Sequence, residues 1–501
     1  MVEKELEKIA QGSGIILLGM ILSKIFNYLY RLIVARYLGP DSYGLLNLGF
    51  AVFGFFSAIS LLGFPSAVLR FVSFYNGKND SERIKGTVIS CLKITLPLSL
   101  ISMVIMYLFA DYIAVNIFHN PSLSSIIRIF SFLVPIMVII SNFENMTQAF
   151  QKVKYNIFIR NVSESGIQFL ITLILFLLGF GLIGAVYGYL FALLSSALIF
   201  IYLVQKKVFP IIGKKIKAIT NYKEIILYTW PLTFVSIIGM IQSWGDNIFI
   251  GVFKTASDVG LYNAALPMAN LLLIAPTTIT FLFIPIITGL YAKNQKEGME
   301  EIYKTTSKWI FFLNLPVLII LTLFSKQVLL VLFGQLYVSG YLVLIVLSLG
   351  FFIYSLLQQP SGVLQSIKKT KFLLVNSALV TAIHVILNIM LIPRFGIMGA
   401  AIATVILFVL WYTILTVKTY SCTKMHPFSK VLLRAFMAAA IAFIIGLIFK
   451  LLLKIQTAWL SLVSIGTISL IIYLVLLFSF GSVTKEDRKM IKMIIPRIKF
   501  H

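Results

Sequence analysis

The sequence is poor in charged residues for its length. Asp, Glu, Lys and Arg make up 12% of the 501 residues, about half the share found in ordinary soluble domains. Acidic residues are the scarcest, 17 against 42 Lys and Arg, while 59% of all residues are hydrophobic. A soluble globular protein could not cover its surface with so few charges. We therefore predict an all-α polytopic membrane protein.

Residues that serve catalysis and metal binding are also few. There are four His and two Cys, and Cys91 and Cys422 lie too far apart in the sequence for a metal-ligand motif. No phosphate loop, HExxH sequence or Ser/His/Asp set occurs, so we expect no enzyme, no metal and no cofactor. A membrane glycosyltransferase or polymerase, the weaker alternative, would need a large outer loop. The longest expected outer loop, residues 111–123, is short.

Fourteen apolar stretches are long enough to cross a membrane as helices, which takes about 20 residues. They are predicted at residues 12–34, 44–66, 87–110, 124–148, 157–178, 181–203, 225–252, 261–287, 306–325, 328–357, 372–393, 396–417, 431–453 and 458–480. Short turns at residues 179–181 and 393–396 join two of the predicted helical hairpins.

Basic residues alternate between abundant and scarce from one connecting segment to the next. With both termini in the cytoplasm, the inner segments carry 32 Lys and Arg and the outer segments carry 6. The other four, Lys24, Arg31, Lys93 and Arg128, lie inside predicted spans. This bias follows the positive-inside rule and predicts a cytoplasmic-membrane protein with both termini inside. The net charge of +25 is then a topology signal and an attraction to anionic lipid, with no nucleic-acid partner expected.

Two pairs of segments indicate an internal duplication. GFGLIGAVYGY (179–189) matches PRFGIMGAAIAT (393–404), with Gly181 aligned to Gly396 and Gly184 to Gly399. YGLLN (43–47) matches VGLYN (259–263), with Asn47 aligned to Asn263. The offsets of the two matches differ by a single position. Two matches so far apart at nearly one offset favour duplication over convergent use of glycine in membrane turns.

The repeat organises the predicted domains. Residues 1–210 and 211–420 form two six-helix lobes that enter the membrane in the same direction, an arrangement that transporters use. Residues 421–501 add a helix pair and a basic cytoplasmic tail, expected to lie on the membrane surface. Substrate is expected between the halves near mid-membrane, and transport by alternating access.

The first span carries cations on one helical face. At 3.6 residues per turn, Lys24, Asn27 and Arg31 align. A charge near the bilayer centre costs about 2.5–3.5 kcal/mol on insertion scales, so these residues predict a water-filled interior and an anionic ligand. The alternative is that both cations extend to the headgroups, which is easier for Arg31 near the helix end.

Three carboxylates are candidates for coupling or for lining a cavity. Glu144 ends span 4 and Glu164 lies in span 5, and both should face water or a cation, in a cavity or a proton relay. Asp246, toward the outer end of span 7, is either a counter-ion for Arg31 or Arg36 or an interfacial carboxylate.

Two further features lie in the predicted second lobe. Span 11 has a polar stripe with two interpretations, cavity hydrogen bonds or contacts between helices. Its members are Ser377, Thr381, His384 and Asn388. Span 8 has three prolines that suit either a bending gate or static kinks. They are Pro267, Pro276 and Pro285.

The segments YRLIVARYLGPDSYGLLNLG (30–49) and LLGFPSAVLRFVS (61–73) resemble the polysaccharide transporter family of the multidrug/oligosaccharidyl-lipid/polysaccharide exporter superfamily. The resemblance covers essentially the whole chain and implies fourteen spans in two six-helix lobes plus a final pair. It also implies that cations of the first helices line the cavity, here Lys24 and Arg31, with Arg36 as a weaker candidate. Residues 261–276 lack the Arg that lipid II flippases of the family carry there, which counts against lipid II itself.

The resemblance implies a flippase that moves a polyprenyl-(pyro)phosphate-linked oligosaccharide across the cytoplasmic membrane for glycan biosynthesis. Expected partners are that substrate, membrane lipids and glycan-assembly enzymes, and we expect a monomer. A proton or sodium gradient or the membrane potential would drive transport. The main rival is a cation-coupled multidrug exporter of the same superfamily, which would favour an acidic cavity and usually twelve spans.

Overall fold

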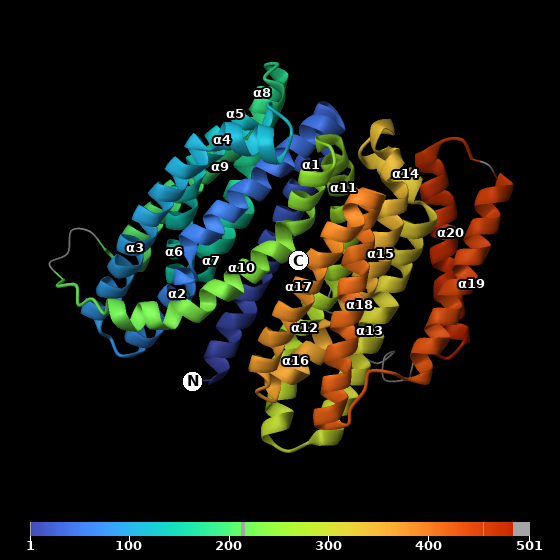
Figure 1. Ribbon diagram of the computed structural model, residues 1–501. Coiled ribbons are helices and arrows are strands. Elements are labelled where there is room, and N and C mark those ends of the chain that lie inside the picture. Colours follow the sequence, from blue (N-terminus) through green and yellow to red (C-terminus); the bar gives the residue numbers. More distant parts are fainter. Residues whose placement is uncertain (1, 212–215, 454, 484–501) are drawn as a thin grey trace. The chain divides into compact units, whose positions relative to one another are not determined.

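A computed structural model describes residues 2–211, 216–453 and 455–483 (Figure 1). The chain divides into two compact units, Met1–Gly260 and Leu261–His501. All secondary structure among the described residues is helical, as a chain that must satisfy its backbone hydrogen bonds inside lipid requires. The basic tail predicted at residues 485–499 lies outside the described residues.

The first unit contains long helices joined by short turns. They are α1 (Val2–Leu61), α2 (Phe64–Gly77), α3 (Ser81–Leu108), α4 (Ala110–Tyr112), η1 (Ile113–Ile117), α5 (Leu123–Ser131), α6 (Leu133–Ala149), α7 (Val153–Asn156), η2 (Ile157–Glu164), α8 (Ser165–Leu177), α9 (Gly181–Leu203), η3 (Val204–Val208) and α10 (Tyr222–Phe253). Helix α11 (Ala256–Ala269) begins in this unit and ends in the second.

The second unit continues in the same way. It contains η4 (Asn270–Leu273), α12 (Ile274–Ala292), α13 (Lys296–Leu323), α14 (Ser325–Leu332), η5 (Gln335–Gly340), α15 (Tyr341–Leu356), α16 (Gln358–Ser366), α17 (Thr370–Phe395), α18 (Ile397–Thr423), α19 (Lys430–Leu453) and α20 (Ala458–Ser479). The proline-rich predicted span 8 is interrupted by the 3₁₀ turn η4, a tighter winding that often marks a bend.

Helix α1 consists of two arms that meet at Gly39. This glycine has φ 75° and ψ 174°, outside the helical region, and Pro40 follows it. Glycine adopts positive φ without steric cost, and proline suits the start of the next helix, so the sequence Gly-Pro allows a sharp reversal. Figure 1 shows α1 rising from the N-terminus and turning back toward α2.

The number of spans agrees with the prediction once this reversal is counted. Twelve helices among the described residues are long and apolar enough to cross a membrane, or thirteen if the bent pair α5 and α6 is one span. Residues 24–61 count there as a single helix. Taking the two arms of α1 as two spans gives the predicted fourteen. The all-α, multi-span fold is therefore confirmed.

The repeated turn sequences share two local features. Gly181, at the turn between α8 and α9, has φ 53°, and Gly396, at the turn between α17 and α18, has φ 60°. Three residues later, Gly184 lies against Phe176 and Gly399 lies against Leu391. The offset that aligns Gly181 with Gly396 also aligns Phe176 with Leu391. The agreement supports duplication, because chance glycines would not share both conformation and partner.

The second pair of repeated segments forms one reciprocal contact inside the first unit. Gly44 packs against Ala256, and Gly260 packs against Pro40. The offset that aligns Asn47 with Asn263 relates Pro40 to Ala256 and Gly44 to Gly260, so each contact is the repeat-related copy of the other. Reciprocal contacts of this kind are typical of a two-fold axis. A Cβ on Gly44 would lie 2.9 Å from the Gly260 nitrogen and overlap the Ala256 carbonyl oxygen.

The second arm of α1 also determines the position of α10. Gly251 near the end of α10 lies against Leu48. Thr233 near its start donates a hydrogen bond of 3.0 Å to the Leu62 carbonyl oxygen at the other end of the arm. The two helices are therefore antiparallel, as expected for spans 2 and 7, because even-numbered and odd-numbered spans cross the membrane in opposite directions.

The final helix pair packs on α13 in the second unit. The hydroxyl of Tyr473 in α20 donates a 3.1 Å hydrogen bond to the Phe312 carbonyl oxygen, and Lys450 of α19 donates to the Leu323 carbonyl oxygen. Small residues of α19 let its backbone approach closely. They are Ala435, Ala438, Ala439 and Ala442.

The predicted domain boundaries at residues 210 and 420 were drawn from the internal duplication. The division into two compact units does not test a duplication, so these boundaries stay a prediction.

The reciprocal glycine contact predicts that replacing glycine by alanine lowers the stability of the protein at Gly44 but not at Gly239. Gly44→Ala should lower the thermal transition of the purified protein by several degrees, because the new methyl must displace a packed backbone at a cost of about 1–3 kcal/mol. Gly239→Ala in α10, where no atom lies within 4 Å of the added Cβ, should leave it unchanged or raise it, because alanine favours helix. Equal transitions for the two variants would contradict the close crossing.

Candidate functional site

The first unit holds a charged cluster centred on Arg160. Its Nη1 lies 2.7 and 2.6 Å from the two carboxylate oxygens of Glu164, and its Nε lies 3.5 Å from Glu144. The side chains are 26% exposed for Arg160, 12% for Glu164 and 35% for Glu144. Two carboxylates that are costly to bury therefore share one arginine, whose planar group can bind both.

Local helix geometry presents this cluster. Arg160 and Glu164 lie in η2, a π-helical stretch in which each turn holds more residues than in an α-helix. The preceding Asn156 donates a 2.9 Å hydrogen bond to the Glu144 carbonyl oxygen, which joins this segment to the end of α6. Widened turns of this kind often occur at functional sites.

The predicted cationic face of span 1 lies along the same segment. The side-chain amide of Asn27 donates a 2.9 Å hydrogen bond to the Ser165 hydroxyl. Ten residues further on, the Tyr37 ring stacks on Phe176 at 4.3 Å, and its hydroxyl donates to the Phe176 carbonyl oxygen. The first arm of α1 and the η2–α8 segment therefore run side by side in the same direction, as spans 1 and 5 must.

The two predicted cations lie on either side of this junction. At 1.5 Å per residue, Lys24 lies about 5 Å before the level of Asn27, and Arg31 lies about 6 Å beyond it. Lys24 is exposed and Arg31 is half-buried. No described carboxylate forms an ion pair with either cation within 4.0 Å. Both charges are thus available to an anionic ligand, whereas Arg160 is already occupied.

Two tyrosines border the cluster. Tyr189 of α9 lies close enough to Arg160 and Glu164 to interact electrostatically. Its ring packs at 4.8 Å against Phe50 on the second arm of α1. The Tyr30 hydroxyl is fully buried and faces Gln168 without meeting hydrogen-bond geometry. Helices α1, α6, α8 and α9 therefore all contribute polar groups to one region of the first unit.

The other predicted site residues differ in their burial. Arg36 is exposed next to the reversal of α1, and Asp246 is half-buried on α10. No ion pair of Arg31 is found among the described residues, so its pairing with Asp246 stays a prediction. His384 and Asn388 are buried, 2% and 0% exposed.

His384 and Asn388 pack inside a hairpin. The Asn388 amide lies 3.3 Å from the His384 Nε2, and the Thr404 hydroxyl of α18 lies 3.5 Å from that nitrogen. These contacts fit the second of the two interpretations of the stripe, in which polar groups hold helices α17 and α18 together.

Two basic residues counted with the inner segments, Arg160 and Lys308, lie at the starts of predicted spans 5 and 9. The structure places Arg160 in η2 and Lys308, only 8% exposed, in α13. Arg160 could have been found, because it precedes Glu164 by four residues, the spacing that pairs side chains on one helical face. The repeat offset maps Arg160 and Glu164 onto Val375 and Leu379. This charge pair thus belongs to one repeat alone.

The arrangement predicts that Arg160 is needed to neutralise its two carboxylates. Arg160→Met should lower stability by about 3 kcal/mol, since it leaves two partly buried carboxylates without their cation. Adding Glu144→Gln and Glu164→Gln should restore much of the loss. Arg128→Met is the matched control, because its pair with Asp111 is about half exposed and should contribute under about 1 kcal/mol.

Thermal transitions of the purified variants measure these effects. If the three side chains acted independently, the triple variant would be less stable than Arg160→Met by the summed effects of Glu144→Gln and Glu164→Gln, each measured alone. That result would refute the cluster as a coupled unit.

Comparison with known proteins places this architecture in a family. The family model described as "Polysaccharide biosynthesis protein" matches residues 9–291, and a second, MatE, matches residues 231–390. The lipid II flippase MurJ of Bacillus subtilis is 25% identical over 79% of this chain and 80% of its own length. A putative O-antigen transporter of Shigella flexneri is 24% identical over 74% of this chain and 88% of its own.

A solved structure shares the fold. The lipid II flippase MurJ in its inward closed conformation superposes with a TM-score of 0.73 at 16% identity, covering 95% of this chain and 99% of that one. Since the first family model covers more than half of the sequence, the chain belongs to the polysaccharide biosynthesis protein family of the multidrug/oligosaccharidyl-lipid/polysaccharide exporter superfamily.

Proposed function

We propose that this protein is a flippase that moves a polyprenyl-(pyro)phosphate-linked oligosaccharide across the cytoplasmic membrane by alternating access. The observation that carries the proposal is the run of cationic groups along the first arm of α1 and the neighbouring η2 segment. The printed functions of the relatives, lipid II flippase and O-antigen transporter, name substrates of this lipid-linked class. A transporter, and not an enzyme, is the role that both lines of support favour.

The diphosphate of such a substrate is the group that the cations would bind. Lys24 and Arg31 offer a point charge and a planar fork without a described carboxylate partner. Charge-assisted hydrogen bonds to phosphate are stronger than neutral ones, and more so where water is scarce. Asn27, between them, is fixed by its hydrogen bond to Ser165 and orients the first arm against α8.

Arg160 provides a route from substrate binding to conformational change. Its carboxylate partners hold it in the ground state at 2.6 to 3.5 Å. A phosphate that draws the guanidinium away would leave Glu144 and Glu164 without their compensating cation. These two carboxylates are therefore our candidates for coupling to a proton or sodium gradient, with the membrane potential as the alternative drive. Asp246, and Arg36 at the reversal of α1, are kept as secondary candidates for coupling and substrate contact.

The membrane setting follows from the charge distribution and the family. We assign the protein to the cytoplasmic membrane with both termini inside, so that the lipid-linked sugar enters from the cytoplasmic leaflet. The working unit is a monomer that receives its substrate from glycan-assembly enzymes. We assign the buried residues His384 and Asn388 to holding the α17–α18 hairpin together, and not to contacting sugars.

The multidrug exporter remains the second candidate because a MatE family model matches residues 231–390. An exporter of cationic drugs would need unpaired carboxylates in its interior. Here the carboxylates of the cluster, Glu144 and Glu164, share an arginine, and the exposed and half-buried charges of span 1 are positive. The charge balance of the first unit therefore favours an anionic substrate.

The site predicts a strong loss of translocation when either span 1 cation is removed. In liposomes with fluorescent polyprenyl-diphosphate-sugar, Lys24→Ala and Arg31→Ala should each slow translocation about tenfold or more, because each loses a charged hydrogen bond to phosphate, about 1.5–3 kcal/mol. Lys93→Ala is the matched control, since Lys93 is an exposed cation on α3, and should flip at the wild-type rate. Unchanged translocation in both test variants would refute the binding site.

The same liposomes separate the two candidate functions. A flippase should move the lipid-linked sugar and leave ethidium inside the vesicles, because span 1 carries positive charge and repels a cationic dye. Ethidium efflux driven by a cation gradient, with no movement of the lipid, would instead establish the drug exporter.

A further inference from the structure

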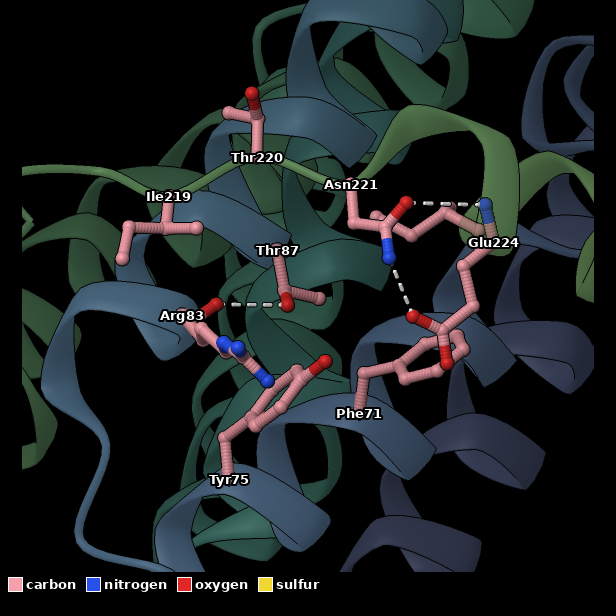
Figure 2. Close-up of a pocket in the computed structure, with 9 residues that line it drawn as sticks. Phe71, Tyr75, Arg83, Thr87, Ile219, Thr220, Asn221 and Glu224 are labelled. Carbon is pink, nitrogen blue, oxygen red and sulfur yellow. Dashed lines mark hydrogen bonds between the residues drawn. The ribbon is translucent and has the colours of Figure 1, made fainter.

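A polar cavity of about 200 Å³ lies in the first unit, away from the charged cluster. It lies between the second half of α2, the first turns of α3 and the segment that leads into α10. Its wall includes Phe71, Tyr75, Arg83, Thr87, Asn221 and Glu224 (Figure 2). About 30 Å³ holds one water molecule, so the cavity has room for a small polar group of several heavy atoms.

The segment before α10 forms one wall of the cavity and is held against the start of α3 by backbone contacts. The Ile219 amide donates a 3.2 Å hydrogen bond to the Glu82 carbonyl oxygen. Gly86 allows this approach, because a Cβ there would overlap the Ile219 carbonyl oxygen. Asn221 then caps α10, accepting a hydrogen bond from the Glu224 amide and donating one of 2.6 Å to the Glu224 carboxylate.

Opposite charges line opposite sides of the cavity. Figure 2 shows Arg83 on one side and Glu224 on the other, with the Tyr75 ring between them. The Arg83 guanidinium lies over the Tyr75 ring at 5.6 Å, and its one described ion pair joins Nε to Asp80 at 3.5 Å. The remaining guanidinium N–H groups and the second Glu224 oxygen can therefore serve a ligand.

A zwitterion fits this wall better than either single charge. A lone anion would be repelled by Glu224 and Asp80, and a lone cation by Arg83. A phosphate against Arg83 and a primary ammonium against Glu224 satisfy both sides. Phe71 lines the same cavity and offers an apolar surface to the methylene groups between phosphate and ammonium.

Neighbouring aromatic residues indicate the depth of lipid headgroups. Trp230 and Phe234 of α10 are exposed, 64% and 54%, and their rings pack edge to face. Arg70 lies over the Tyr228 ring at 4.3 Å, close to the cavity wall formed by Phe71. Exposed Trp and Tyr with cationic neighbours are typical of the membrane–water boundary. The predicted topology puts this boundary on the cytoplasmic side.

We propose that this cavity binds the phosphoethanolamine headgroup of a membrane lipid of the cytoplasmic leaflet. Arg83 binds the phosphate, Glu224 accepts from the ammonium, and the acyl chains extend along the exposed aromatic face of α10. Occupancy would brace the start of α10 against α3. The proposal does not depend on which substrate the protein transports.

Lipid binding to the purified full-length protein tests this site. Native mass spectrometry should show phosphatidylethanolamine bound at least tenfold more tightly than phosphatidylcholine, whose quaternary ammonium has no N–H to donate to Glu224. Phosphatidylethanolamine should also raise the thermal transition. Equal or tighter binding of phosphatidylcholine or phosphatidylglycerol would overturn the proposal.

Two variants separate the two sides of the headgroup. Arg83→Ala should weaken phosphatidylethanolamine at least tenfold, while Glu224→Gln, which retains an acceptor for Asn221, should abolish the preference over phosphatidylcholine. Lys93→Ala should bind like the wild type. Unchanged selectivity in Glu224→Gln would overturn the assignment whatever the stability of Arg83→Ala. Soluble glycerophosphoethanolamine binding as tightly as the lipid would overturn the membrane source.

Discussion

The first unit depends on one close approach of backbones, the crossing of α1 and the start of α11. Gly44 and Gly260 lack side chains where the other helix passes, and a methyl at either position would overlap the opposing backbone. In lipid, helices gain no hydrophobic energy by associating, so such close packing supplies much of the attraction. The contact is reciprocal between repeat-related residues, as expected if a duplication supplied both halves of the interface. Gly39 and Pro40, just before it, reverse the chain so that the second arm can descend beside α10.

The charged side chains of the candidate site are distributed unevenly between the two repeats. The first repeat carries Lys24, Arg31 and the Arg160 cluster, while the offset between the repeats maps Arg160 and Glu164 onto Val375 and Leu379. The concentration of these cations in the first repeat suits a substrate that is charged at one end and apolar at the other. Each intramembrane cation is costly alone, about 2.5–3.5 kcal/mol. Arg160 is stabilised by two carboxylates, whereas no described carboxylate forms an ion pair with Lys24 or Arg31.

The polar cavity of the first unit also presents charged groups, on α3 and α10. Arg83 and Glu224 lie on helices that are held by caps and by the docked segment through Ile219. Their opposite charges match the zwitterion that we propose as a ligand, whereas the charges of the Arg160 cluster are compensated among its own groups.

The sequence by itself determined the class of fold, because apolar stretches of about 20 residues leave helices as the only structure that satisfies the backbone in lipid. It also predicted the repeat, through glycines that share a positive φ in the structure, Gly181 and Gly396. It identified Glu144 and Glu164 as carboxylates that should face water or a cation. Only the tertiary structure decided that the cation is Arg160, since Glu144 lies sixteen residues away on another helix. It alone brought Asn27 to Ser165, and it buried His384 and Asn388 inside a hairpin. One-dimensional spacing specifies which residues share a helical face, but which faces meet depends on packing between helices distant in sequence.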